Sequence, residues 1–137
     1  MSGWDLTSRS VAFLESLPTK WTKTIDGVRV AVHHARPGND MNGIPHDATD
    51  AELVELLREA AADVLIVGHT HEMFARRLPD GKLVANAGAL LRDPAPGVDV
   101  ATPGTFGILT IENGATKFEI RRAADGAIVA HDQKRRR

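Results

Sequence analysis

Two histidines in the motif Gly68-His69-Thr70-His71 have the residue type and spacing of a metal site. The motif directly follows an apolar run over 64–67, which has the length and composition of a buried strand. Two residues that flank a third in extended backbone project to the same side. The glycine lets the chain turn tightly where the strand ends. Because imidazole nitrogens are common ligands of divalent ions, the motif predicts one part of a metal-binding site.

The carboxylates that a hydrolytic two-metal centre also requires are harder to find. The sequence has no Asp-x-His, Gly-Asp or Gly-Asn-His cluster, and the spacing of Asp40, Asp47 and Glu72 singles none of them out. Three histidines can hold one Zn²⁺, Mn²⁺ or Fe²⁺, whereas a second ion nearby is opposed by the repulsion of uncompensated charges. We therefore expect the chain alone to form a weak, poorly hydrolytic site for a single metal ion.

The elements that must position these histidines can be located from local signals. Thr49 and Glu52 form a capping box ahead of apolar residues at helical spacing, which predicts a helix over 49–61. Turn signals such as Asp26-Gly27 separate the predicted strands. The other predicted elements are a helix over 8–17, strands over 21–25, 28–32 and 63–67, a hairpin of 73–78 and 82–85, and strands over 105–111, 116–121 and 127–131, with loops over 35–48 and 93–104.

Composition narrows the class of protein. The 137 residues carry a formal net charge of −1 and no cysteine, so thiolate ligands are excluded and nucleic acid is not indicated as a partner. No apolar run approaches the roughly 20 residues of a membrane span, and the first residues lack a signal peptide. We expect a cytoplasmic protein without a membrane partner. Residues 1–137 are expected to form one domain with a basic tail over 132–137.

The order of these features resembles calcineurin-like metallophosphoesterases, and within them the small YfcE-type phosphodiesterases. The features are an apolar strand that ends in His33, a long loop, a capped helix, the strand before the Gly-His-Thr-His motif, a hairpin and Asn86-Ala87-Gly88-Ala89. They match the C-terminal half of that family. The family's N-terminal half, with its Asp-x-His, Gly-Asp and Gly-Asn-His-Asp motifs, has no counterpart in this chain.

The resemblance implies metal ligands residue by residue. His33 matches the ligand at the strand end, and His69 and His71 match the two ligands of the motif. His34 stands where the family has glycine, so it is an accessory candidate that adds a ligand or blocks one. Asn86 is a second accessory candidate, in a turn that departs from the family's Asn-Pro-Gly-Ser. No catalytic residue is assigned; the implied cofactor is a divalent metal, first Mn²⁺, with Zn²⁺, Fe²⁺ or Ni²⁺ as alternatives.

The fold class that follows is α/β, the β-rich half of an αββα sandwich, mostly antiparallel, with one or two covering helices. Such a half leaves an apolar sheet face uncovered. We expect that face to be covered by a partner chain carrying the N-terminal half, or by a second copy in a homo-oligomer. Three functions stay open: a phosphoesterase for phosphodiesters or phosphomonoesters that is incomplete in this chain, a non-catalytic metal-binding or interaction module, and a structural fragment that binds no metal.

Overall fold

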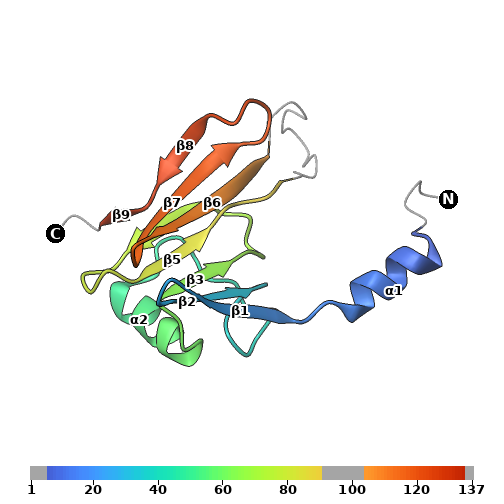
Figure 1. The fold of residues 1–137 in the computed structure, drawn as a ribbon, viewed down its shortest axis with the longest axis horizontal. Coiled ribbons are helices and arrows are strands. Elements are labelled where there is room, and N and C mark those ends of the chain that lie inside the picture. Colours follow the sequence, from blue (N-terminus) through green and yellow to red (C-terminus); the bar gives the residue numbers. More distant parts are fainter. Residues whose placement is uncertain (1–5, 91–103, 135–137) are drawn as a thin grey trace.

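The computed structural model describes residues 6–90 and 104–134. Two helices and nine strands form along these residues, and Figure 1 shows them in chain order. Their bounds are α1 Ser8–Ser16, β1 Lys20–Ile25, β2 Val28–His33, α2 Asp50–Glu59, β3 Val64–Val67, β4 Phe74–Arg77, β5 Leu83–Asn86, β6 Thr105–Glu112, β7 Ala115–Arg122, β8 Ile128–His131 and β9 Gln133–Lys134.

The larger sheet has six strands in the order β1-β2-β3-β5-β4-β9. Strands β2, β3 and β5 run parallel to one another, with Val32 opposite Ile66 and Val67 opposite Asn86. Strands β1 and β4 pair antiparallel with β2 and β5. Parallel strands end at the same edge of a sheet, and ligand sites of α/β proteins gather there. The residues that follow β2 and β3 are thereby brought together.

The smaller sheet is an antiparallel meander in the order β6-β7-β8. Strands β6 and β7 are joined by Asn113-Gly114, both with positive φ (52° and 78°), as a two-residue hairpin turn requires. The sheet-rich α/β class predicted from the sequence is confirmed, and three parallel strands in the larger sheet add to the predicted antiparallel pattern.

Helix α2 covers one face of the larger sheet, and the smaller sheet packs on the opposite face. The central strands of the larger sheet are therefore covered on both faces, which corrects the expectation of an uncovered apolar sheet face. The capping box of Thr49 and Glu52 is present at the start of α2, as predicted. Apolar side chains of α2, the strands and the loop before the helix form the first core: Ala31, Ile44, Leu53, Leu56, Leu57, Leu65 and Val84. The second core lies between the sheets and includes Val30, Val64, Leu83, Phe118 and Ile120.

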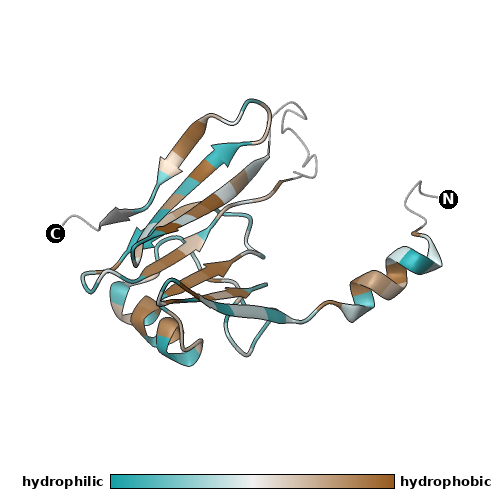
Figure 2. Ribbon diagram, viewed as in Figure 1, coloured by the Kyte–Doolittle hydropathy of each residue, from teal (hydrophilic) through white to brown (hydrophobic). Residues whose placement is uncertain are grey.

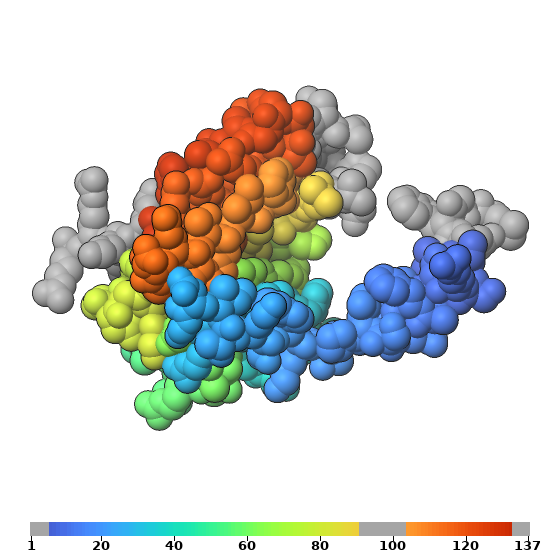
Figure 3. Space-filling view, in the orientation of Figure 1, coloured from blue at the N-terminus to red at the C-terminus, as the bar shows by residue number. Residues whose placement is uncertain are grey.

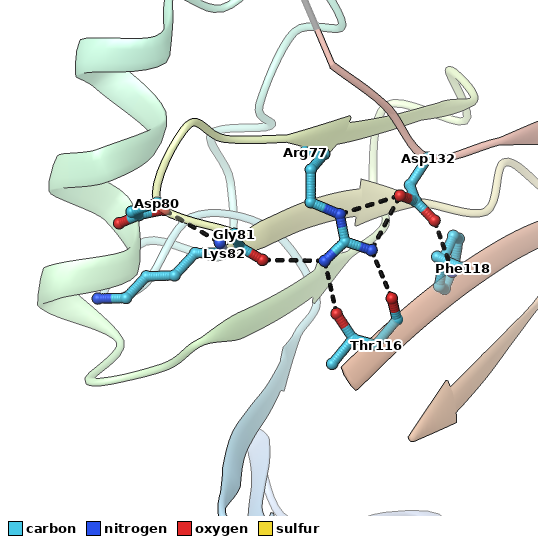
Figure 4. Close-up of polar contacts among 7 residues, drawn as sticks. All are labelled: Arg77, Asp80, Gly81, Lys82, Thr116, Phe118 and Asp132. Carbon is cyan, nitrogen blue, oxygen red and sulfur yellow. Dashed lines mark hydrogen bonds and ion pairs between the residues drawn. The ribbon is translucent and has the colours of Figure 1, made fainter. Parts of the chain in front are cut away.

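Arg77 of β4 joins the two sheets through hydrogen bonds to several elements (Figure 4). Its guanidinium binds the Asp132 carboxylate at 2.9 Å and donates to the Thr116 carbonyl at 2.6 Å. Asp132 in turn accepts a hydrogen bond from the backbone N–H of Phe118 at 2.9 Å. Both charged side chains are mostly buried, so this cluster fixes how the smaller sheet sits on the larger one.

Helix α1 stands away from both sheets, as Figures 1 and 3 show. It forms as predicted, with the Thr7 hydroxyl accepting a hydrogen bond from Ser10 N at 3.1 Å, but it buries none of its residues. Phe13 and Leu14 are 62% and 51% exposed, and Figure 2 shows both hydrophobic and hydrophilic colours along the helix. None of the described helices has the length and apolar character needed to cross a membrane.

Two of the segments predicted from the sequence extend beyond the residues that the structure describes. Most of the predicted loop over 93–104 lies outside the described residues, as do the last three residues of the basic tail. The tail's beginning forms strand β9, which pairs in parallel with β4, Arg76 lying opposite Gln133. Part of the expected tail therefore belongs to the larger sheet.

Candidate metal centre

The histidine loop, residues 68–71, begins where β3 ends, and His34 follows the last residue of the neighbouring strand β2. The backbone N–H of Gly68 donates to the His34 carbonyl at 2.9 Å, which ties the two strand ends together. The rings of His34 and His69 then meet edge to face, with Nε2 of His34 3.1 Å from Nδ1 of His69. The structure thus brings two imidazoles into contact at the edge that parallel strands share.

His33 faces a different part of the molecule. It is the last residue of β2, and side chains two apart on a strand share a face, so His33 lies on the face of Ala31 beneath α2. There it lines a pocket with Lys20, Asp40 and the end of α2. Partial burial lowers the pKa of His33, Lys20 adds to this effect, and Asp40 opposes it. The contact with His69 is therefore made by His34, to which the sequence assigned only an accessory role.

The backbone of the histidine loop is unusual because both histidines have positive φ, so the extended backbone expected from the sequence is absent at these two residues. The angle is 69° at His69 and 61° at His71, in the left-handed region that few residues other than glycine enter. Asn86, the other accessory candidate, is completely buried at the end of β5. Its amide donates to the Gly68 carbonyl at 3.1 Å. Asn86 therefore holds the loop through this hydrogen bond, and its side chain is not accessible to solvent.

The carboxylate next to the histidine loop, Glu72, binds another histidine. Its Oε2 lies 3.0 Å from Nδ1 of His46, and both side chains are more than half exposed. The hydrogen bond raises the pKa of His46 and lowers the pKa of Glu72. Glu72 and His46 thus form a hydrogen-bonded pair at the surface beside the motif, and the pair is ionic when His46 is protonated.

The donor set of the described residues suits one part of a metal centre. Ligand nitrogens lie about 2.0–2.1 Å from an ion such as Zn²⁺, so two of them on one ion are roughly 3.0–3.4 Å apart. In the structure His34 and His69 are hydrogen-bonded to each other through nitrogens 3.1 Å apart, a separation that also falls in that range. Within residues 6–90 and 104–134, however, no three His, Asp or Glu side chains are grouped closely enough to hold an ion. His33, His69 and His71 remain the ligands predicted from sequence, and the structure brings only His34 against His69.

Comparison with known families places this geometry in context. The model of the calcineurin-like phosphoesterase superfamily domain matches residues 3–114. The chain therefore belongs to the calcineurin-like phosphoesterase superfamily. Comparison with curated protein sequences gives no significant match.

Solved structures with the same fold include eukaryotic and prokaryotic proteins. Vps29 from Entamoeba histolytica, in a complex with zinc, is 24% identical with a TM-score of 0.58 over 85% of this chain. A hypothetical protein from Pyrococcus horikoshii is 17% identical with a TM-score of 0.63 over 83% of the chain. A metallophosphoesterase from Sphaerobacter thermophilus is 17% identical with a TM-score of 0.54 over 88% of the chain.

The chain spans only part of each of these proteins. It covers 60% of the Entamoeba protein, 43% of the Pyrococcus protein and 56% of the Sphaerobacter protein. The likeness concerns the fold, because identity is below 25% in each case.

Proposed function

We propose that the chain provides the histidine part of a divalent-metal centre that hydrolyses phosphodiesters or phosphomonoesters. His34 and His69 would be ligands of one ion, and His71 would be a further ligand from the same loop. The observation that carries the proposal is the 3.1 Å contact between His34 Nε2 and His69 Nδ1, in a chain that belongs to the calcineurin-like superfamily. His34 thus takes the place at the strand end that the resemblance assigned to His33.

In such a centre the metal ion activates the substrate and water, and residues of the chain hold the ion in place. Bound divalent ions polarise phosphoryl oxygens and make a water molecule more acidic. The chain's residues would hold unprotonated imidazole nitrogens toward the ion from two adjacent strand ends. Mn²⁺ is our first choice and Zn²⁺, present in the Entamoeba Vps29 structure, is the main alternative, with Fe²⁺ and Ni²⁺ next.

Hydrolysis also needs carboxylate ligands, and we propose that they come from outside the described residues. Neighbouring folds contain additional chain beyond the part matched here, and this chain would correspond to the C-terminal portion of a YfcE-type enzyme. A partner that carries the remaining portion, or a second copy, would supply the carboxylates in the cytoplasm. The uncovered apolar residues of α1 and β1 support this proposal.

A non-catalytic metal-binding or interaction module is the second candidate. It is favoured by the lack of any three grouped ligands within the described ranges 6–90 and 104–134. Both candidates predict that His34 and His69 bind a metal ion. Only the phosphoesterase predicts that the bound metal supports hydrolysis.

The test is a metal titration combined with a hydrolysis assay. Metal-free protein is titrated with Mn²⁺ and Zn²⁺ by calorimetry and then assayed with bis-p-nitrophenyl phosphate. We expect His34→Ala to weaken binding by more than about 100-fold, since loss of a ligand exceeds the 10–100-fold effect of outer-shell groups. His33→Ala is the matched control from the adjacent position, and it should bind as the wild type does.

Each result has a defined meaning. Turnover that His34→Ala abolishes would show that carboxylates of this chain, or of its own oligomer, complete the centre. Binding without turnover would favour the non-catalytic module, or a site that awaits its partner. Equal loss of affinity in His33→Ala and His34→Ala would contradict the assignment of His34, and no binding by the wild type would contradict the metal centre itself.

A further inference from the structure

Two left-handed histidines in one short loop need an explanation. At His69 and His71 the φ angles are 69° and 61°, and each such conformation in a residue with a side chain is costly unless its surroundings enforce it. Neither histidine side chain is buried. The enforcement must therefore come from the residues that hold the loop backbone.

Asn86 provides the first part of that support. It is 0% exposed, and its side chain makes three hydrogen bonds. The amide nitrogen donates to the Gly68 carbonyl and to the Thr70 hydroxyl oxygen, both at 3.1 Å. The amide oxygen accepts a hydrogen bond from Gly88 N at 2.9 Å. One buried side chain thus binds the loop before His69 and again between the two histidines.

Thr70 provides the second part, from its position between the histidines. Its hydroxyl oxygen accepts the hydrogen bond from Asn86 and a second one from the backbone N–H of Glu72 at 3.2 Å. Its own N–H donates to the Gly68 carbonyl at 2.9 Å. The hydroxyl oxygen therefore links the buried amide to the peptide on the far side of His71.

We propose that Asn86 and Thr70 are positioning residues that hold His69 and His71 in the left-handed conformations required for metal binding. This inference rests on the proposed metal centre. The Asn86 amide would act through the Thr70 hydroxyl, and neither side chain would touch the ion. Outer-shell hydrogen bonds of this kind orient metal ligands in proteins and affect affinity strongly when removed.

Thr70 offers a cleaner test than Asn86, because replacing a completely buried amide risks unfolding the chain. Thr70→Val keeps the shape of the side chain and removes only the hydroxyl oxygen. Thr70→Ser keeps that oxygen and removes the methyl group. If the two hydrogen bonds to this oxygen position the histidines, Thr70→Val should weaken metal binding, and Thr70→Ser should retain it.

The experiment measures metal binding and the metal-free loop in all three proteins. Titration with Co²⁺ reports affinity and, through its visible absorption spectrum, ligand geometry. We expect Thr70→Val to bind Co²⁺ about 10- to 100-fold more weakly with an altered spectrum, and Thr70→Ser to resemble the wild type. Without metal, amide hydrogen exchange at Glu72 should accelerate in Thr70→Val alone.

The two arms separate failure of this inference from failure of the metal centre. If Thr70→Val matches the wild type in exchange and Co²⁺ binding, or if Thr70→Ser is as impaired as Thr70→Val, the positioning role is overturned. If the wild type binds no Co²⁺, the metal centre and its positioning are overturned together. The exchange data then still show whether the Thr70 hydroxyl holds the loop.

Discussion

Gly43 lies so close to the histidine loop that a larger residue would not fit. A Cβ atom at this position would overlap Cγ2 of Thr70 and come within 3.3 Å of the His69 ring. Ile44, the next residue, is buried in the first core and anchors this part of the loop, and the small size of Gly43 lets the loop approach Thr70 and His69 closely. Gly43 thus shapes the surroundings of the candidate metal centre by its small size, although it has no side chain to contribute.

Gly43→Ala should therefore disturb the centre more than the fold. We expect about 10-fold weaker Mn²⁺ or Zn²⁺ binding, because the added methyl group pushes Thr70 and His69 from their positions. Thermal unfolding should show a loss of about 1–3 kcal/mol, typical of overpacking. Calorimetry and thermal melts measure the two effects, with Asn42→Ala in the same loop as control. Unchanged metal affinity in Gly43→Ala would show that this contact does not shape the site.

The two adjacent histidines show what the sequence leaves open at the scale of single residues. The motif 68–71 was located from composition and spacing, and the structure places it at a strand end as expected. The choice between His33 and His34 depends on the last residue of β2, because each step along a strand reverses the side-chain direction. The sequence predicts a strand over 28–32 that runs into His33, and β2 ends at His33. The alternation of side chains along β2 puts His33 beneath α2, and His34, the next residue, contacts His69.

At the scale of elements, Asp63 connects the strands on which the site depends. Its carboxylate accepts hydrogen bonds from the backbone and side chain of Arg29, the two oxygens lying 2.9 and 3.0 Å from the donors. Its backbone carbonyl accepts a hydrogen bond from Leu83 N at 3.0 Å. This residue, directly before β3, thus binds both β2 and β5, the two parallel neighbours. The hydrogen bonds from Arg29 lower the pKa of Asp63 below its usual value.

The lowered pKa of Asp63 predicts a pH dependence of stability with a definite sign. The carboxylate stabilises the fold above the pKa of an unfolded aspartate, near 3.8, and this contribution is lost as the pH falls through the lower folded pKa. Asp63→Asn should therefore cost about 1 kcal/mol at pH 7, and the difference from wild type should shrink below about pH 4.

Chemical denaturation at several pH values measures that difference. Asp47→Asn, which replaces an exposed carboxylate, is the control and should follow the wild type throughout. A difference between Asp63→Asn and the wild type that stays constant down to pH 3 would show that charge at this position does not stabilise the fold.

Local sequence signals predict most helices and strands, but they do not predict how these elements are arranged in the two sheets. The capping box, the apolar spacing and the Asp-Gly and Asn-Gly turns identify α2 and the hairpins within a few residues, because each depends on neighbours in the chain. Strand order depends on packing between distant segments. The parallel pair of β4 with β9 joins Arg76 to Gln133, and no local pattern in a basic tail indicates such a partner.

At the scale of the whole molecule, one apolar surface lacks a cover among the described residues. Trp21 of β1 is 44% exposed and Val32, opposite it on β2, is 36% exposed. Val32 lies two residues before His34, so this surface leads toward the candidate metal centre. Helix α1, which stands away from both sheets, separately exposes Phe13 and Leu14. A nine-residue helix without tertiary contacts is marginal in water, which supports a partner or a second copy at this surface.

We expect the isolated chain to reveal this surface by self-association or by binding an apolar dye. Phe13→Ser combined with Leu14→Ser should reduce either signal, because these side chains make up much of the exposed apolar area of α1. Ala12→Ser on the same helix changes little apolar area and serves as the control. Light scattering and dye fluorescence measure the outcome. A monomer that binds no dye would contradict an uncovered interface.

The cluster around Arg77 also has a consequence for the order in which the chain folds. Arg77 belongs to the larger sheet, whereas its partner Asp132 lies 55 residues further along, after β8. Until that late segment is in place, the guanidinium lacks its countercharge. Loop closure over such a distance is slow compared with hairpin or helix formation. Strands β1 to β5 and α2 can therefore assemble first. The smaller sheet and β9, the last strand of the larger sheet, join them when Asp132 arrives to neutralise Arg77.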